Sequence, residues 1–166
     1  MLMKVFPHGT GEGDKPSRYL VRPDYPGRDT APPQVLRGDP AMTRALIDSI
    51  ERRWKFTSGA LSWHPEEKIS EAQEEEVMDA FERVAFAGLE ADQRNILWVR
   101  HTHAGHHELH FLIPRLELSS GKDFNACPPG WQKDFDVFRD LFNWREGWAR
   151  PDDPERTRDE LPKKAD

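Results

Sequence analysis

Two apolar segments separated by a short polar stretch constrain the fold of this chain most. Residues 96–100 read ILWVR and residues 111–118 read FLIPRLEL, while residues 101–110 between them, HTHAGHHELH, hold five of the chain's seven histidines. Two apolar runs on either side of a few polar residues around a glycine predict a β-hairpin. The pattern therefore concentrates imidazole rings at one end of a pair of strands.

Strand geometry predicts that three of these side chains converge. Residues i and i+2 of a strand share a face, so Glu108 and His110 project together, opposite to Leu109 and Phe111. His101 ends the preceding strand, and antiparallel pairing brings it opposite this pair. Imidazole nitrogen and carboxylate oxygen suit Mn²⁺, Zn²⁺ or Mg²⁺, so we expect a divalent metal site. The other histidines of this stretch, His103, His106 and His107, lie nearer the turn. They could be exposed, could contact DNA or could support the metal ligands.

The remaining hydrophobic pattern predicts an alternation of strands and helices. Strands are expected over residues 3–9, 35–38, 55–63, 95–101 and 107–118. Helices are expected over residues 15–22, 40–54, 70–89 and 130–148. This order does not match regular βαβ winding. We therefore expect an α+β fold, with a small central antiparallel sheet and flanking helices.

Caps and apolar stripes refine the expected helices. Three residues are placed to cap the first three helices: Asp14, Asp39 and Ser70. The predicted buried stripes are Met42, Ala45, Leu46 and Ile50 in the second helix; Val77, Phe81, Val84 and Ala85 in the third; and Phe135, Phe138, Leu141 and Phe142 in the last. The acidic run within residues 64–76 is interpreted as the solvated first turns of the third helix.

Composition limits the class of protein. The chain has 166 residues, 36% hydrophobic and 33% charged, which is globular composition with room for one core. Its apolar runs are far shorter than the ~20 residues of a membrane span, so no membrane insertion is expected. The single cysteine, Cys127, cannot form an internal disulfide and suits a reducing, cytoplasmic setting. We expect one domain over residues 1–149 and a polar, flexible tail over residues 150–166.

The charge distribution bears on nucleic-acid binding. The net charge of −6 argues mildly against a nucleic-acid partner, but residues 61–95 alone carry ten acidic against three basic side chains. Residues 1–60 carry ten basic against seven acidic side chains, so a basic face remains possible.

One similar metal motif is excluded by the residues that it lacks and by the length of the chain. HTHAGH resembles the HxHxDH signature of hydrolases with the metallo-β-lactamase fold, but Gly105 stands where that signature has aspartate. Only His110 remains downstream as a later ligand, and the chain is short for that fold.

The spacing His101-x6-Glu108-x-His110 on a hairpin resembles the metal motif of the HUH endonuclease superfamily, in its relaxase branch. The chain is most similar to the mobilisation relaxases of colicinogenic plasmids, which also have an acidic residue at the second ligand position. That group has asparagine at the third position, where His110 restores the residue usual in the superfamily. The segments HGTGEGDKPSRYLV, VLRGDP, FTSGALSW and ELHFLIPRLELSSGK also match in order, so the resemblance spans roughly residues 3–125.

The resemblance implies a nuclease of plasmid mobilisation. It assigns the nucleophile to Tyr19 and the ligands of Mg²⁺ or Mn²⁺ to His101, Glu108 and His110. The implied reaction nicks single-stranded DNA at an origin of transfer and leaves a 5′-phosphotyrosyl link and a free 3′-OH. The implied partners are the DNA, accessory relaxosome proteins and a secretion coupling protein.

Other residues are candidates for supporting roles. Three basic side chains lie within a turn of Tyr19 and are candidates to hold DNA phosphates: Lys15, Arg18 and Arg22. His103 and His8 are candidates for the shell around the ligands. Tyr25, in the turn PDYPG, is interpreted as structural.

Other functions are left open by the sequence. The chain could be a relaxase-like protein that binds DNA without cutting it, or a metal hydrolase without a covalent intermediate. Replication initiation and transposition use the same tyrosine chemistry. The chain could also be either an excised catalytic domain or a small complete member of the family.

Overall fold

The fold is a five-stranded antiparallel sheet between two layers of helices. A computed structural model of the chain describes residues 1–150. The strands are β1 (Leu2–Val5), β2 (Gln34–Arg37), β3 (Phe56–Ser62), β4 (Leu97–His101) and β5 (Glu108–Pro114). Their order across the sheet is β1-β3-β5-β4-β2, and every neighbouring pair is antiparallel. The hairpin β4–β5 therefore lies inside the sheet, and the expected α+β class is confirmed.

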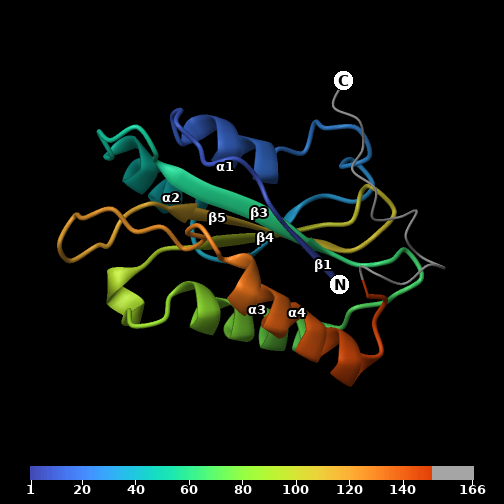
Figure 1. The fold of residues 1–166 in the computed structure, drawn as a ribbon. Helices are drawn as coiled ribbons and strands as arrows, with labels where there is room; N and C mark the ends of the chain where they lie inside the picture. Colours follow the sequence, from blue (N-terminus) through green and yellow to red (C-terminus); the bar gives the residue numbers. More distant parts are fainter. Residues whose placement is uncertain (151–166) are drawn as a thin grey trace.

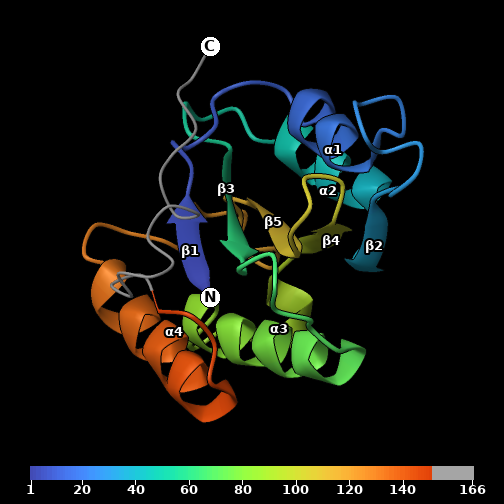
Figure 2. The ribbon, with the colours of Figure 1, turned by 90° about the vertical axis from the view of Figure 1, so that its right-hand side faces the viewer.

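Each face of the sheet carries two helices. Those on one face are α1 (Asp14–Val21) and α2 (Pro40–Asp48), and those on the other are α3 (Glu71–Ala85) and α4 (Gln132–Glu146) (Figure 1). A 3₁₀ turn, Ala91–Gln93, precedes β4. Figure 2 shows the two helix pairs on opposite sides of the strands. Within residues 1–150 no helix has the length and apolar character needed to cross a membrane.

The alternation of side chains along β5 separates the core into two parts. Leu109, Phe111 and Ile113 are buried in the larger cluster, on the α3–α4 side. Leu112, one residue out of phase, is buried in the smaller cluster with Leu20 of α1. The faces predicted for Leu109 and Phe111 are therefore confirmed, and the face shared by Glu108 and His110 is the one covered by α1.

Two of the three predicted caps are confirmed. The side chain of Asp39 accepts a hydrogen bond from the N–H of Ala41, and Ser70 forms a full capping box with Gln73. The prediction for Asp14 is wrong, because Gly13 is the N-cap of α1 and makes no side-chain cap. Asp14 lies in the first turn instead and pairs with Arg18, which is favourable at a helix N-terminus.

The predicted apolar stripes are confirmed at Ile50, Phe135, Phe138 and Phe142 but are wrong at some positions of α2 and α4. Met42 and Ala45 are exposed, because α2 turns Thr43 and Ile47 toward the sheet, and the helix ends at Asp48 rather than continuing to Trp54. In α4 the predicted Leu141 is exposed. The buried positions of α4 are Phe135, Phe138, Phe142 and Asn143.

The acidic run at the start of α3 is only partly solvated. Glu74 is buried and accepts hydrogen bonds from Nε and Nη2 of Arg100, the first of them at 2.7 Å. His107 Nε2 lies 2.8 Å from the same carboxylate. The interpretation of this run as a solvated surface is therefore wrong for Glu74, which anchors α3 to β4 and to the end of the hairpin turn.

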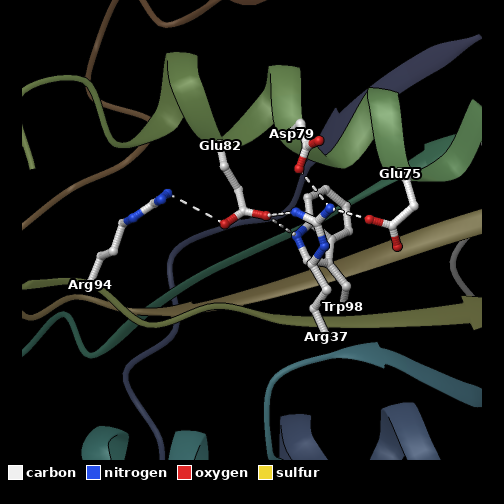
Figure 3. A network of polar contacts seen from close by, with 6 residues as sticks. All are labelled: Arg37, Glu75, Asp79, Glu82, Arg94 and Trp98. Atoms are coloured by element: carbon white, nitrogen blue, oxygen red, sulfur yellow. Dashed lines mark hydrogen bonds and ion pairs between the residues drawn. The ribbon is translucent and has the colours of Figure 1, made fainter. Parts of the chain in front are cut away.

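A second ionic cluster fastens the edge strand β2 to α3 (Figure 3). Arg37 donates to Glu75 at 2.6 Å, Asp79 at 2.7 Å and Glu82 at 2.6 Å. Glu82 also accepts hydrogen bonds from Arg94 and from the indole N–H of Trp98, each at 3.3 Å. The segment that follows α1 is thereby tied to the opposite helix layer. The tail expected over residues 150–166 lies, apart from Arg150, outside the described residues.

Candidate metal and tyrosine site

Three side chains of the hairpin form one compact cluster. His101 and Glu108 are direct partners across β4 and β5, as hairpin geometry predicted, and His110 follows two positions later. The potential ligand atoms of these three residues all lie within 4.8 Å of one another. The ring centroids of His101 and His110 are 4.2 Å apart. Both strands are inside the sheet, so the backbone holds this cluster rigidly.

His101 is prepared to act as a neutral ligand. It is 1% exposed, and burial, together with the neighbouring His110, lowers its pKa to about 4. Its Nε2 lies 2.7 Å from the carbonyl oxygen of Leu20 on α1. A carbonyl can only accept, so Nε2 carries the hydrogen and Nδ1 keeps the lone pair that a metal requires.

Glu108 is held as a carboxylate. Burial tends to raise its pKa, but His106 and His110 outweigh that effect and hold the pKa of Glu108 well below its usual value. The Nε2 atoms of both histidines lie 3.6 Å from the same Glu108 oxygen. Two imidazoles and one carboxylate are a donor set suited to Mn²⁺, Mg²⁺ or Zn²⁺. The residues present therefore fit a divalent cation.

Tyr19 lies beside this cluster on the outer part of α1. Its ring centroid is 6.4 Å from that of His101 and 5.6 Å from that of Tyr25. The side chain remains accessible, with 42% of the residue exposed. Burial of the hydroxyl and the neighbouring Tyr25 raise the pKa of Tyr19, so the phenol is protonated at neutral pH. The tyrosine and the ligand cluster thus share one face of the sheet.

Arg28 is a component of the site that sequence reasoning missed. Its side chain is 0% exposed, and its guanidinium lies 4.9 Å from the ring of Tyr19 and 4.7 Å from that of Tyr25. Nη1 donates to the carbonyl oxygens of Tyr19, at 2.5 Å, and Arg22, at 3.1 Å. The sequence offers only a basic residue in a proline-rich loop, with no periodicity that would predict its burial.

The predicted phosphate-binding side chains are all exposed, two on α1 and Arg22 directly after it. Lys15 is exposed. Arg18 pairs with Asp14 at 3.0 Å, and Arg22 pairs with Asp24 at 2.9 Å. Each of these arginines would have to give up an acidic partner to bind DNA.

The two histidines predicted to support the ligands lie in different places. The ring of His103 is 5.3 Å from that of His101 and 5.6 Å from that of Tyr25, so the structure brings it to the site. The structure does not bring His8 there. Its Nδ1 lies 3.3 Å from Thr57 Oγ1, and Thr57 pairs with Ile113, near the opposite end of β5 from Glu108. The contact that orients His101 comes instead from the Leu20 carbonyl.

Sequence comparisons place the chain in a family. The chain matches the family described as "Relaxase: MobA/VirD2-like, nuclease domain" over residues 41–143, a range that contains the three candidate ligands but begins after Tyr19. It is 41% identical over 157 residues to "Cryptic plasmid protein C" of Neisseria gonorrhoeae, covering 93% of this chain and 74% of that protein. It is 36% identical over 159 residues to "DNA relaxase MbeA" of Escherichia coli, covering 95% of this chain but only 30% of that protein. No solved structure matches. The chain therefore belongs to the MobA/VirD2-like relaxase nuclease family, as the resemblance in its sequence predicted.

Proposed function

We propose that this chain nicks single-stranded DNA at an origin of transfer by attack of Tyr19 on a backbone phosphate. The observation that carries the proposal is the contact between α1 and the ligand cluster. The helix that bears Tyr19 orients His101 through the Leu20 carbonyl, 2.7 Å from His101 Nε2. A candidate nucleophile and a candidate metal site are thereby fixed relative to each other.

The chemistry follows from the groups present. The Tyr19 oxygen attacks phosphorus and the bond from phosphorus to the 3′ oxygen breaks. The phenolic proton is lost to solvent, and the leaving 3′ oxygen takes up a proton from solvent. The products are a 5′-phosphotyrosyl link on Tyr19 and a free 3′-OH. A divalent cation held by His101, Glu108 and His110 would supply neutralisation of charge on the non-bridging oxygens of the phosphate. The link conserves the energy of the broken bond, so the strand can be rejoined without a nucleotide cofactor.

Residues around Tyr19 restrict the orientation of its phenol. Arg28 binds the backbone carbonyl of Tyr19 and lies over its ring, which limits the directions in which the phenol can point. A fixed nucleophile contributes to rate because less freedom is lost on reaching the transition state. The proposal also includes a role in plasmid mobilisation and a cytoplasmic location. It further includes contacts with accessory relaxosome proteins and a secretion coupling protein. The similarity to a protein named as a DNA relaxase supports it.

The test is formation of a covalent protein–DNA adduct. Labelled single strands covering a plasmid origin, together with a pool of random sequences, are incubated with Mn²⁺ or Mg²⁺ and separated on a denaturing protein gel. We expect an adduct that disappears in Tyr19→Phe and with chelator, while the matched variant Tyr25→Phe retains it. An adduct that persists in Tyr19→Phe would place the nucleophile elsewhere. DNA binding with no adduct on any sequence would favour a non-cutting protein, and cleavage without an adduct would favour a hydrolase.

A further inference from the structure

A small pocket adjoins the candidate active site on the α1 side of the sheet. Its volume is about 110 Å³, and its walls include Phe6, Tyr19 and His110. The other side chains that matter here are apolar: Pro16 and Leu20 from α1, and Leu112 from β5. The candidate nucleophile and one candidate ligand thus form two walls of the same pocket.

Phe6 forms the outer wall of this pocket. It follows β1, and its backbone N–H donates to the carbonyl of Ser58 on β3 at 2.9 Å, which fixes its place over the sheet. Its ring centroid lies 6.5 Å from that of His110. The residue is nevertheless 40% exposed. A large aromatic ring is therefore held open to solvent directly beside the site.

The position and chemistry of the walls define what the pocket can take. Any group inside it lies next to the phosphate that Tyr19 would attack, because Tyr19 and His110 border both. The side-chain walls are mainly apolar and aromatic, so they favour a flat group with an apolar face over a charged one. In single-stranded DNA that group is a nucleobase, which stacks well on aromatic side chains.

We propose that this pocket binds the nucleobase adjacent to the scissile phosphate, stacked on Phe6. The inference rests on the proposed function and adds to it a DNA-binding subsite that positions the strand. Recognition is by stacking and shape, since Ser58 is the one pocket residue with a polar side chain besides Tyr19 and His110. The subsite should therefore need a base at that position but should discriminate less among the different bases.

The test pairs a change in the protein with a change in the DNA. Binding is measured by fluorescence anisotropy in a Tyr19→Phe background, which keeps the ring in the pocket wall and prevents attack by the Tyr19 hydroxyl. A series of oligonucleotides carries one abasic nucleotide at each successive position. We expect a single abasic position to weaken binding about tenfold, and Phe6→Ala to weaken binding of intact DNA by a similar factor. The combination should be no weaker than either change alone.

Control variants distinguish a loss of base binding from a loss of folding and from a loss of nicking. Trp144→Ala removes an aromatic residue that is 82% exposed on α4, on the opposite face, and should leave every affinity unchanged. Phe6→Leu keeps an apolar wall without a ring, and it should behave like Phe6→Ala while unfolding at the wild-type temperature. Multiplicative effects of Phe6→Ala and the abasic position, or unchanged binding by Phe6→Ala, would overturn the subsite. Adduct formation by the wild-type chain is scored separately, so a failure of nicking is distinguishable from a failure of the subsite.

Discussion

The imidazole of His101 is hydrogen-bonded to the backbone carbonyl of Leu20, at 2.7 Å. This bond joins the centre of the sheet to α1, the helix that bears Tyr19. Because a main-chain atom supplies the acceptor, the orientation of His101 depends on where α1 lies and not on the identity of a side chain. The family match over residues 41–143 does not include this helix, so the connection between Tyr19 and the candidate ligands rests on this bond and on the Tyr19 ring, 6.4 Å from that of His101.

Metal binding should stabilise the fold. Mn²⁺ at 100 times its Kd would add about 2.7 kcal/mol to the free energy of unfolding, and the increase should appear as a higher Tm. His110→Ala should abolish the increase, since it removes one of three donors. His64→Ala, which removes a histidine outside the cluster, should retain it. An equal increase in Tm for wild type and His110→Ala would contradict the assigned ligands.

Replacing Arg28 should slow the nicking reaction strongly but should change the affinity for the metal little. Arg28→Ala removes the hydrogen bonds to the carbonyls of Tyr19 and Arg22, and we expect a loss of about 2 kcal/mol in the free energy of unfolding. Adduct formation should slow at least about tenfold because Tyr19 is no longer fixed. The Kd for Mn²⁺ should stay within about twofold, measured by calorimetry. Arg44→Ala, an exposed arginine on α2, serves as the matched control, and equal adduct rates in the two variants would exclude a positioning role.

The ion pair of Glu74 and Arg100 should contribute to the acid sensitivity of the fold. Burial opposes the charge of Glu74, but Arg100 and His107 outweigh that effect and lower its pKa below the usual 4.5. The pair's contribution is therefore complete above about pH 4.5 and is lost as the pH falls through the lower folded-state pKa. Glu74→Gln should destabilise the protein by about 3 kcal/mol at pH 7. The difference from wild type should shrink on acidification, as measured by urea unfolding at a series of pH values, and a constant difference would contradict this account.

Cys127 should be unreactive in the folded protein. Burial raises the pKa of its thiol to about 12, so almost no thiolate is present near neutral pH. A chromogenic disulfide reagent should detect no thiol in the native chain and one thiol per chain after unfolding in guanidinium. Rapid reaction of the native protein would show that the segment around Cys127 opens readily.

The sequence predicted the site's core because strand periodicity is a local rule. Alternation along residues 107–111 sufficed to place Glu108 and His110 on one face, and antiparallel pairing brought His101 opposite them. The fold class followed from the order of elements. These inferences depend on neighbours in sequence or on a single hairpin, where few arrangements compete.

The predictions of burial that were wrong concern residues whose contacts come from distant segments of the chain. Leu141 is exposed although apolar, while the polar Asn143 is buried because it bonds to Met1, at the other end of the chain. Glu74 resembles its solvated neighbours in sequence, and its burial is explained by two distant partners, Arg100 on the sheet and His107 at the hairpin turn. Arg28 is buried by two tyrosines that no local pattern connects to it. Periodicity cannot predict which polar residue will find a partner across the fold.

The candidate site is divided between a strand inside the sheet, β5, and a short helix at the surface, α1, and these should open at different rates. β5 is hydrogen-bonded along both edges, to β3 and β4, whereas α1 is a helix of eight residues flanked by loops. Amide hydrogens of β5 should therefore exchange with solvent only when the whole domain unfolds, and those of α1 by local opening. Local opening of α1 would move Tyr19 and release the Leu20 carbonyl from His101, while the backbone of β4 and β5 stays in register. The backbone frame of the candidate metal site should therefore persist through openings that disturb the candidate nucleophile and the orientation of His101.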